Sequence, residues 1–274
     1  MARAGGRQRS PAAGRPDEES DFFVRALGRG LVILGLFDVE HPDWGLSEIC
    51  SRTGISKTTA YRMLRTLETM GYLVYEARTE RYHLGAATIP GAYLALSYVG
   101  FVRAAHAFLE ELAEATGETI ELTVGAAAGA VVVDEVATTH PFRLNRPIGR
   151  ILDTLANSSF RMHVAFRPTA ERRRIVGAGL ARLTPNTVTD SDEIMKRMES
   201  ERDAGLAYDM EEQDLRVCAA SAPILERDGS CRAVLTVVAP VERFGPRERK
   251  KKAEALKSTA AALSKSLGGR GIAG

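Results

Sequence analysis

Two neighbouring stretches decide the fold of the N-terminal part of the chain. They read Leu46-Ser-Glu-Ile-Cys-Ser-Arg-Thr-Gly54 and Lys57-Thr-Thr-Ala-Tyr-Arg-Met-Leu-Arg-Thr-Leu67. Ser47 is a natural N-cap for the first stretch, and Gly54 ends it as a left-handed C-cap. Ser56 caps the second stretch in the same way. Two short helices joined by so tight a turn predict a helix-turn-helix.

The second of these helices has two unlike sides. At helical spacing, one side is apolar, with Ala60, Met63, Leu64 and Leu67, and the opposite side carries Lys57, Thr58, Tyr61, Arg62 and Arg65. Between Ile49 and Leu67 the chain has basic residues but no acidic one, although its formal net charge is only +2. This local excess suits the phosphate backbone of DNA. The alternative is a solvated helix face without a partner.

Several residues of this motif are candidates for DNA contact. Short polar side chains at the start of the second helix, on Ser56, Thr58 and Thr59, allow close approach to the duplex. We expect base-edge contacts from Lys57, Thr59, Tyr61 and Arg62, and phosphate contacts from Arg52 and Arg65.

A β-hairpin follows the helix-turn-helix. After Gly71, a β-prone run at 72–75, a polar turn at 76–80 and a second run at 81–84 predict a wing. Arg78 and Arg81 lie at its tip and on its second strand, where a minor-groove or backbone contact is feasible. Together these elements predict a winged helix-turn-helix domain over residues 21–85.

Helices are expected on both sides of this motif. The apolar spacing of Ala26, Leu27, Leu31, Leu34 and Phe37 predicts a first helix over 22–37 with these residues inward. A linker helix over 86–98, with Pro90 in its first turn, is expected within a linker and dimerisation segment, 86–100. An amphipathic helix over 101–116, stopped by Gly117, then opens a second domain at 101–268.

The second domain is expected to be an antiparallel sheet with flanking helices, which makes the fold class α+β. Strands are predicted over 119–124, 130–136, 142–145, 218–225 and 232–238, with Asp228-Gly229 as a hairpin turn between the last two. Helices are predicted over 169–176, 190–204 and 246–267, and Asp190 with Glu193 resembles a capping box.

Composition limits the setting in which the protein works. Three cysteines, Cys50, Cys218 and Cys231, are an odd count that suits a reducing compartment, so we expect the cytoplasm. No apolar run approaches the roughly 18 residues of a membrane span, and the Arg-rich start is no secretory signal. Residues 1–20 lack the apolar content to fold and are expected to be a disordered arm, as are residues 269–274.

The N-terminal motifs resemble those of the IclR family of bacterial regulators. Besides the two helical stretches, the resemblance includes Arg29–Phe37, Gly71-Tyr-Leu73 and Arg81-Tyr-His-Leu-Gly85. In the second half it includes Glu118–Leu122, Gly149-Arg150, Leu183–Asp190, Gly205–Asp209 with Glu211-Glu212, and Cys218–Ile224. Most of residues 22–267 is covered.

This resemblance implies a GAF-like effector domain that binds a small organic or aromatic acid, and assembly as a homodimer or a dimer of dimers. The residues that it implies for the effector pocket are Leu155, Asn157, Ser158, Ser159, Asp209, Cys218, Thr236 and Val238. Where the family has a His-Ala-x-Gly-x-Gly-Lys-Ala type loop, this chain has Leu155-Ala-Asn-Ser-Ser-Phe-Arg-Met162. Ser158 and Ser159 offer hydroxyl donors to a carboxylate there, and Arg161 offers a charge.

The sequence displays no catalytic machinery. Its five histidines are scattered, no metal-ligand spacing occurs, and there is neither a nucleophile elbow nor a phosphate loop. We therefore expect no enzyme activity, no metal and no cofactor. The prediction is a sequence-specific regulator, a repressor rather than an activator, that binds a palindromic operator in double-stranded DNA. The alternative is a small-molecule-binding or protein-interaction module without direct DNA recognition.

Overall fold

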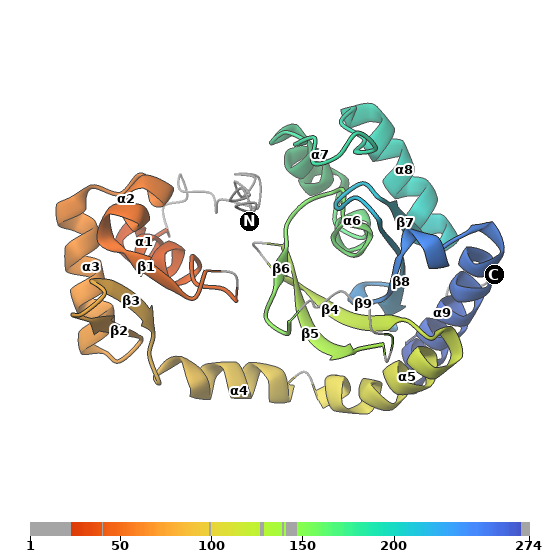
Figure 1. The fold of residues 1–274 in the computed structure, drawn as a ribbon, viewed down its shortest axis with the longest axis horizontal. Coiled ribbons are helices and arrows are strands. Elements are labelled where there is room, and N and C mark those ends of the chain that lie inside the picture. The colour runs from red at the N-terminus through yellow and green to blue at the C-terminus, as the bar shows by residue number, and fades with distance from the viewer. Residues whose placement is uncertain are drawn as a thin grey trace. The chain divides into compact units, whose positions relative to one another are not determined.

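The computed structural model describes residues 23–39, 41–98, 100–126, 129–138, 140 and 147–269. The chain divides into two compact units between Gly100 and Phe101 (Figure 1). The expected arm at 1–20 and the strand expected at 142–145 lie outside the described residues, and so does the expected tail beyond Gly269. In the part of the chain that the structure describes, no helix is long and apolar enough to cross a membrane.

The first unit is a winged helix-turn-helix. Its elements are α1 (Arg25–Leu34), β1 (Asp43–Gly45), α2 (Leu46–Thr53), α3 (Lys57–Thr69), β2 (Leu73–Glu76), β3 (Arg81–Leu84) and α4 (Thr88–Tyr98). The three strands form an antiparallel sheet in the order β1-β3-β2. Ile49, Leu64 and Tyr82 meet in a core between α2, α3 and the wing. The helix-turn-helix and the hairpin therefore form one packed body.

The structure corrects three details of this unit. Strand β1 was not expected. Helix α2 is capped at Gly45 and not at Ser47, because the Glu48 carboxylate accepts a hydrogen bond from the Gly45 N–H at 2.9 Å. On α1, Leu27 and Leu31 are 62% and 58% exposed, whereas Ile33 is buried. The N-terminal part of α1 carries a second apolar stripe, and spacing alone does not say which stripe faces the core.

The second unit is built on a six-stranded antiparallel sheet. Its strands are β4 (Thr119–Ala126), β5 (Gly129–Val136), β6 (Ile151–Leu152), β7 (Ala207–Met210), β8 (Val217–Leu225) and β9 (Cys231–Pro240). They are arranged in the order β6-β5-β4-β9-β8-β7. The helices are α5 (Gly100–Thr116), α6 (Ser158–Ala165), α7 (Thr169–Gly177), α8 (Ser191–Ala204) and α9 (Pro246–Ser266), and a short 3-10 turn lies at Val241–Arg243.

Helices α6 and α9 cover opposite faces of this sheet (Figure 1). Residues that pair directly across antiparallel strands share a face. Thus Ser221, Thr236 and Glu121, which pair in one row across β8, β9 and β4, lie on the α6 face. The sheet thereby presents a row of buried polar side chains to α6.

The α+β fold with an antiparallel sheet and flanking helices is confirmed. The strands expected at 119–124, 130–136, 218–225 and 232–238 are β4, β5, β8 and β9, and the later helices are α7, α8 and α9. Asp190 caps α8, its side chain accepting from the Glu193 N–H at 2.8 Å. Helix α6 and the strands β6 and β7 were not predicted.

Candidate functional site

The polar side of α3 lies on the surface of the first unit. Its apolar side is in the core, with Ala60 and Leu64 fully buried. The exposed candidates are Ser56, Lys57, Thr58, Tyr61, Arg62 and Arg65. Thr59 is half-buried, and its hydroxyl accepts a hydrogen bond from the Ser56 hydroxyl at 2.9 Å. The helix therefore presents a cationic, hydroxyl-bearing surface.

The N-terminus of α3 has free capacity for an anion. Ser56 is the N-cap residue, but its side chain makes no capping hydrogen bond and instead donates to Thr59. The first-turn N–H groups of a helix have no partner within the helix and carry partial positive charge. A phosphate oxygen placed there accepts these hydrogen bonds, which suits backbone contact with DNA.

The cations of the motif differ in how they are paired. Arg65 lies 2.9 Å from the Glu68 carboxylate one turn later and remains largely exposed. Within the described residues, Arg52, Lys57 and Arg62 form no ion pair, and all three are exposed. Unpaired surface cations keep their full capacity for phosphate or base-edge contact.

The two wing arginines have different environments. Arg78 is 83% exposed at the hairpin tip, 3.3 Å from the Glu76 carboxylate. Arg81 is half-buried and forms ion pairs with Asp43 of β1 and Glu48 of α2, the latter at 2.8 Å. The hydrogen bond with Asp43 raises the pKa of Arg81 above its usual value. Arg81 thus ties the wing to β1 and α2, and the DNA contact expected of it stays a prediction.

All of the implied effector residues except Cys218 lie in or beside the α6 segment or on the sheet face that α6 covers. Asn157 caps α6, its side-chain oxygen accepting from the Phe160 N–H at 3.0 Å, and its amide nitrogen donates to Gln213 at 2.7 Å. The Asp209 carboxylate accepts from the backbone N–H of Glu212 at 2.8 Å and of Gln213 at 3.4 Å. Asn157 and Asp209 therefore meet at the same turn.

Hydroxyl groups link the first turn of α6 to the sheet. Ser158 lies 2.7 Å from Ser221, which lies 2.9 Å from Thr236. Ser159 lies 2.6 Å from Thr123, oxygen to oxygen in each case. We call these five residues, all buried, the hydroxyl cluster. Thr123 and Ser221 were missed from the sequence, although the position of Ser221 within the expected strand 218–225 placed it near the implied pocket.

Beside the cluster lies a buried histidine. The Nε2 atom of His163 is 3.0 Å from the Thr123 hydroxyl. Burial, and to a lesser degree the charge of Arg167, lowers the pKa of His163 to about 4. The ring is therefore neutral near pH 7, so it adds no positive charge to this face.

The structure separates Cys218 from the other implied effector residues. Cys218 pairs with Met210 and Ala239, in the row next to that of Asp209, Ala219 and Val238. Met210 contacts Arg249 of α9, 3.8 Å from Nη1 to Sδ, which places its row on the α9 face. Strand alternation therefore puts Cys218 on the side opposite Thr236 and Val238. Burial raises the pKa of its thiol to about 11.

Arg161 is not available to a ligand as a charge. It is fully buried and binds the Glu201 carboxylate with two hydrogen bonds, at 2.8 and 2.9 Å. It also donates to the carbonyl oxygen of Leu155 at 2.6 Å. Arg197 joins the same network through Glu201 at 3.0 Å and Glu212 at 2.7 Å. The expectation of a ligand-facing Arg161 was wrong, because the guanidinium already has its partners.

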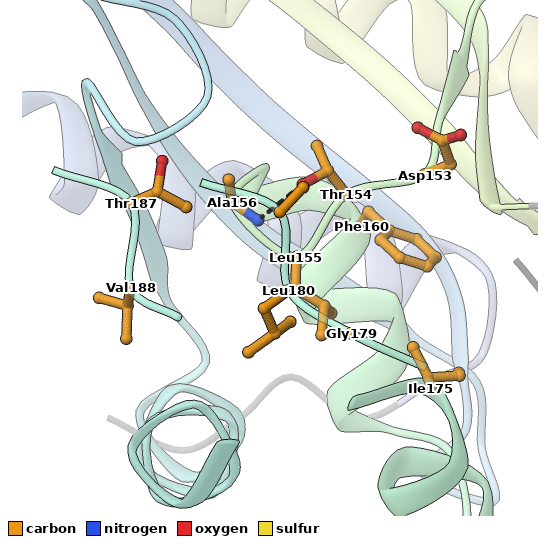
Figure 2. A pocket seen from close by; sticks show the side chains of 11 residues that line it. Asp153, Thr154, Leu155, Ala156, Phe160, Ile175, Gly179, Leu180, Thr187 and Val188 are labelled. Atoms are coloured by element: carbon orange, nitrogen blue, oxygen red, sulfur yellow. Dashed lines mark hydrogen bonds between the residues drawn. The ribbon is translucent and has the colours of Figure 1, made fainter. Parts of the chain in front are cut away.

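Leu155 lies on a small cavity that is lined by both apolar and polar residues. Figure 2 shows its side chain near those of Leu180, Ile175 and Phe160, with Val188 at the side. The volume is about 20 Å³, which holds a single water molecule. This cavity is too small for an organic acid, and Leu155 belongs to the apolar core with Phe160.

Comparison with known proteins places this geometry in a family. A family model for the IclR helix-turn-helix domain matches residues 26–77, and one for the C-terminal domain of bacterial IclR transcriptional regulators matches residues 93–265. The chain is 27% identical over 230 residues to the HTH-type transcriptional regulator KdgR of Escherichia coli K12, covering 84% of this chain and 88% of KdgR.

Solved structures share the fold. An IclR transcriptional regulator from Silicibacter sp. TM1040 superposes with a TM-score of 0.82 at 24% identity, covering 89% of this chain and 96% of that one. An IclR homologue from Microbacterium hydrocarbonoxydans, solved in complex with 4-hydroxybenzoate, gives 0.70 at 20% identity, covering 88% and 98%. The matched family consists of DNA-binding regulators of transcription and not of enzymes.

Proposed function

Because the chain belongs to the IclR family of bacterial transcriptional regulators, we propose that it is a cytoplasmic repressor whose operator affinity is changed by a small organic or aromatic acid. The operator is a palindromic or nearly palindromic promoter site, bound by a homodimer or a dimer of dimers. Repression follows if the bound protein occupies the site that the polymerase needs.

The exposed cationic side of α3 supports the DNA-binding part of this proposal most directly. Its base-facing candidates, Lys57, Tyr61 and Arg62, are exposed, and Arg52 is exposed at the end of the preceding helix. A recognition helix in the major groove contacts base edges from its N-terminal residues, which is where Lys57 lies. The face is neither acidic nor apolar, as a helix that serves protein contacts alone would be.

Helix α4 supports the proposed dimer. Ile89, Tyr93 and Leu94 are exposed on this short helix. Large apolar side chains clustered on a surface mark an interaction site. We infer that α4, in the linker segment 86–100, pairs with its copy in the second protomer, so that two α3 helices reach two half-sites about one helical turn apart or a multiple of it.

The effector part of the proposal rests on the α6 face. The relative from Microbacterium hydrocarbonoxydans binds 4-hydroxybenzoate, which supports a small acid as the class of ligand. Seven of the implied residues, Cys218 being the exception, lie in or beside the α6 segment or on the sheet face that α6 covers. A ligand there changes operator affinity only if it binds more tightly to one of two arrangements of the DNA-binding units.

The experiment compares binding of the purified protein to DNA from upstream of its own gene and to a random duplex of equal length, over a range of salt concentrations. We expect a clear preference for the upstream DNA and a steep loss of affinity with salt. Equal affinity for both duplexes would contradict the proposal. A ligand that binds tightly but leaves operator affinity unchanged would contradict only the proposed effect of the ligand on DNA binding.

A further inference from the structure

A groove runs between the edge strand β7 and helix α9 of the second unit. Its volume is about 580 Å³, and it is open to solvent and not enclosed. Tyr208 of β7 lines it and lies on the α9 face of the sheet, because it is two residues from Met210, which contacts Arg249 of α9. The groove is therefore on the side of the sheet opposite to Thr236 and Val238.

Much of the groove lining is apolar. Leu206 and Tyr208 line it from the strand side, and Pro246 and Ala253 line it from the helix side. Leu206 and Tyr208 are only half-buried, so part of this lining is in contact with water. Removing apolar surface from water is favourable, and apolar surface gathered in a groove is typical of an interaction site. An occupant with apolar side chains would cover this surface.

The same groove is lined by three cations. Arg249 lies over the Tyr208 ring, 5.6 Å from its centroid, and Lys250 and Lys257 follow on the same helix. None of the three forms an ion pair among the described residues, whereas Lys252 of the same helix is paired with Glu118 and Glu248. The one acid in the lining is Glu254. The groove therefore combines apolar surface with positive charge that has no partner.

This combination selects among the classes of ligand. Sites for small molecules enclose most of the ligand surface, which an open groove does not do. The phosphate backbone of a nucleic acid would pair with the cations but would leave Leu206 and Tyr208 uncovered. A protein segment with acidic and apolar side chains matches both properties.

The edge of β7 indicates how such a segment binds. The carbonyl oxygen of Tyr208 already accepts hydrogen bonds from Arg197, at 2.6 Å, and from Arg161. An added strand would need this carbonyl group for its own ladder of hydrogen bonds. A partner therefore binds through its side chains, against α9 and the Tyr208 ring.

We propose that the groove between β7 and α9 binds an acidic segment of a partner protein, whose carboxylates pair with Arg249, Lys250 and Lys257 and whose apolar side chains cover Leu206 and Tyr208. This interaction goes beyond the proposed function, since it needs neither the operator nor the small acid. It gives the second unit a protein partner in addition to its proposed ligand.

Fluorescence anisotropy with the full chain tests the proposal with three labelled peptides. From Pro246 to Lys257, α9 spans about 16 Å, so probes of about twelve residues cover the groove even as a helix. The first probe repeats Glu-Glu-Leu, the second has Ser in place of Leu, and the third has Lys in place of Glu. We expect the first to bind about tenfold more tightly than the second, and the third not to bind.

The probes contradict the proposal in three ways. Equal affinity for the Leu and Ser probes would show that the apolar lining is not used. Binding of the Lys probe as tightly as the Glu-Glu-Leu probe would show that the cations do not select the partner. Absence of binding of the Glu-Glu-Leu probe would overturn the proposal as a whole.

Variants test whether the probe binds in the groove. Reversing two cations together, in Lys250→Glu with Lys257→Glu, should weaken the Glu-Glu-Leu probe about tenfold. Lys265→Glu, the same reversal at an exposed position of α9 outside the groove, is the matched control and should change the affinity little. Denaturant unfolding shows that the variants are folded. Unchanged affinity in the double variant, or an equal loss in Lys265→Glu, would refute the site.

Three further measurements exclude other occupants. Arg62→Glu on α3 should leave the probe affinity unchanged, because a loss there would place the peptide on the cationic side of α3. The double variant should keep the wild-type sedimentation coefficient and the wild-type affinity for duplex DNA. A smaller assembly would assign the groove to a second copy of this chain, and weaker DNA binding would assign it to nucleic acid. Any of these three results would overturn the proposal.

Discussion

Helices α3 and α6 both carry polar and basic side chains, but they hold them in opposite ways. On α3, Lys57 and Arg62 are exposed and have no ion pair among the described residues. On α6, Arg161 is fully buried between Glu201 and backbone carbonyl groups, and Ser158 and Ser159 are bonded to the sheet.

The polar groups of α3 are free to bind an external partner, whereas those of α6 stabilise the folded state. An exposed cation costs the folded state little and keeps its capacity for an external anion. A buried charge is tolerated only when hydrogen bonds and an opposite charge compensate it, and removing one member leaves the others uncompensated. Substitutions on α6 should therefore act first on stability, and substitutions on α3 on DNA binding.

Arg161→Met gives the largest effect expected from this comparison. It removes both hydrogen bonds of Arg161 to Glu201, which keeps only Arg197 as a cationic partner, and it removes the donor to the carbonyl oxygen of Leu155. We expect the free energy of unfolding to fall by about 3 to 5 kcal/mol. Denaturant unfolding followed by circular dichroism measures it. The one tryptophan, Trp44, lies in the first unit. The unfolding transition followed by its fluorescence should therefore keep the same denaturant midpoint.

The matched control for Arg161 is Arg174→Met on α7, whose side chain is exposed and whose only ion pair among the described residues is with Glu171 at 4.0 Å. We expect it to change the free energy of unfolding by less than about 0.5 kcal/mol. A loss below about 1 kcal/mol in Arg161→Met would show that α6 does not depend on its buried charge.

His163 extends the comparison to pH. Burial lowers its pKa to about 4 in the folded chain, below the roughly 6.5 of an unfolded histidine. The unfolded state therefore binds the proton first, so the stability that the neutral ring contributes is complete above pH 6.5 and is lost progressively between pH 6.5 and 4. By linkage the loss is about 2 kcal/mol at pH 5.

Unfolding curves of the wild type and of His163→Gln, taken between pH 7 and 4.5, measure this loss of stability. The variant should lose less stability than the wild type as the pH falls. His83→Gln, which removes an exposed histidine from β3, is the control, and its free energy of unfolding should depend on pH as that of the wild type does. The same pH dependence in the wild type and in His163→Gln would contradict a buried neutral ring.

The same difference explains how much of each site could be predicted from the sequence. Helix α3 is half exposed, so its apolar and cationic sides repeat at helical spacing and could be recognised. Every residue of α6 from Ser158 to Ala165 is buried. A helix that is buried all round has no polar side, and its residues carry no periodic signal. The segment was therefore expected to be a loop.

Ion-pair and strand partners that are distant in sequence could not be predicted either. Arg81 is 38 residues from Asp43, and only the three-stranded sheet brings them together. Cys218 matched a family pattern, but the pairing register that sets its face could not be derived from one strand alone. Local patterns therefore predicted the elements and the DNA-facing side of α3, whereas ion pairs and sheet faces required the fold.

Arg62→Ala tests the α3 side of the comparison. Arg62 forms no ion pair among the described residues, so the free energy of unfolding should be unchanged. Operator affinity should fall about tenfold. If Arg62 contacts a phosphate, the slope of log affinity against log salt also falls by about one. Lys265→Ala, an exposed cation on α9, is the control. Unchanged affinity would remove Arg62 from the interface.

The smallest expected effect comes from comparing the two wing arginines. Arg81→Ala breaks the ion pairs with Asp43 and Glu48, which are partly exposed, and should cost at most about 1 kcal/mol of stability. Operator affinity should fall because the wing is less firmly placed, but the salt slope should stay unchanged, since no phosphate contact is lost.

Arg78→Ala should do the reverse, because its side chain at the wing tip is exposed and supports little of the fold. We expect an unchanged free energy of unfolding. If the tip reaches the DNA backbone, the slope of log affinity against log salt concentration should also be smaller by about one. A lower slope in Arg81→Ala would mean that Arg81 leaves Asp43 and Glu48 to bind phosphate when DNA is present. In that case the wing, like α3, would carry a cation that binds DNA. The first unit would then hold the binding charges of this comparison and the second unit the structural ones.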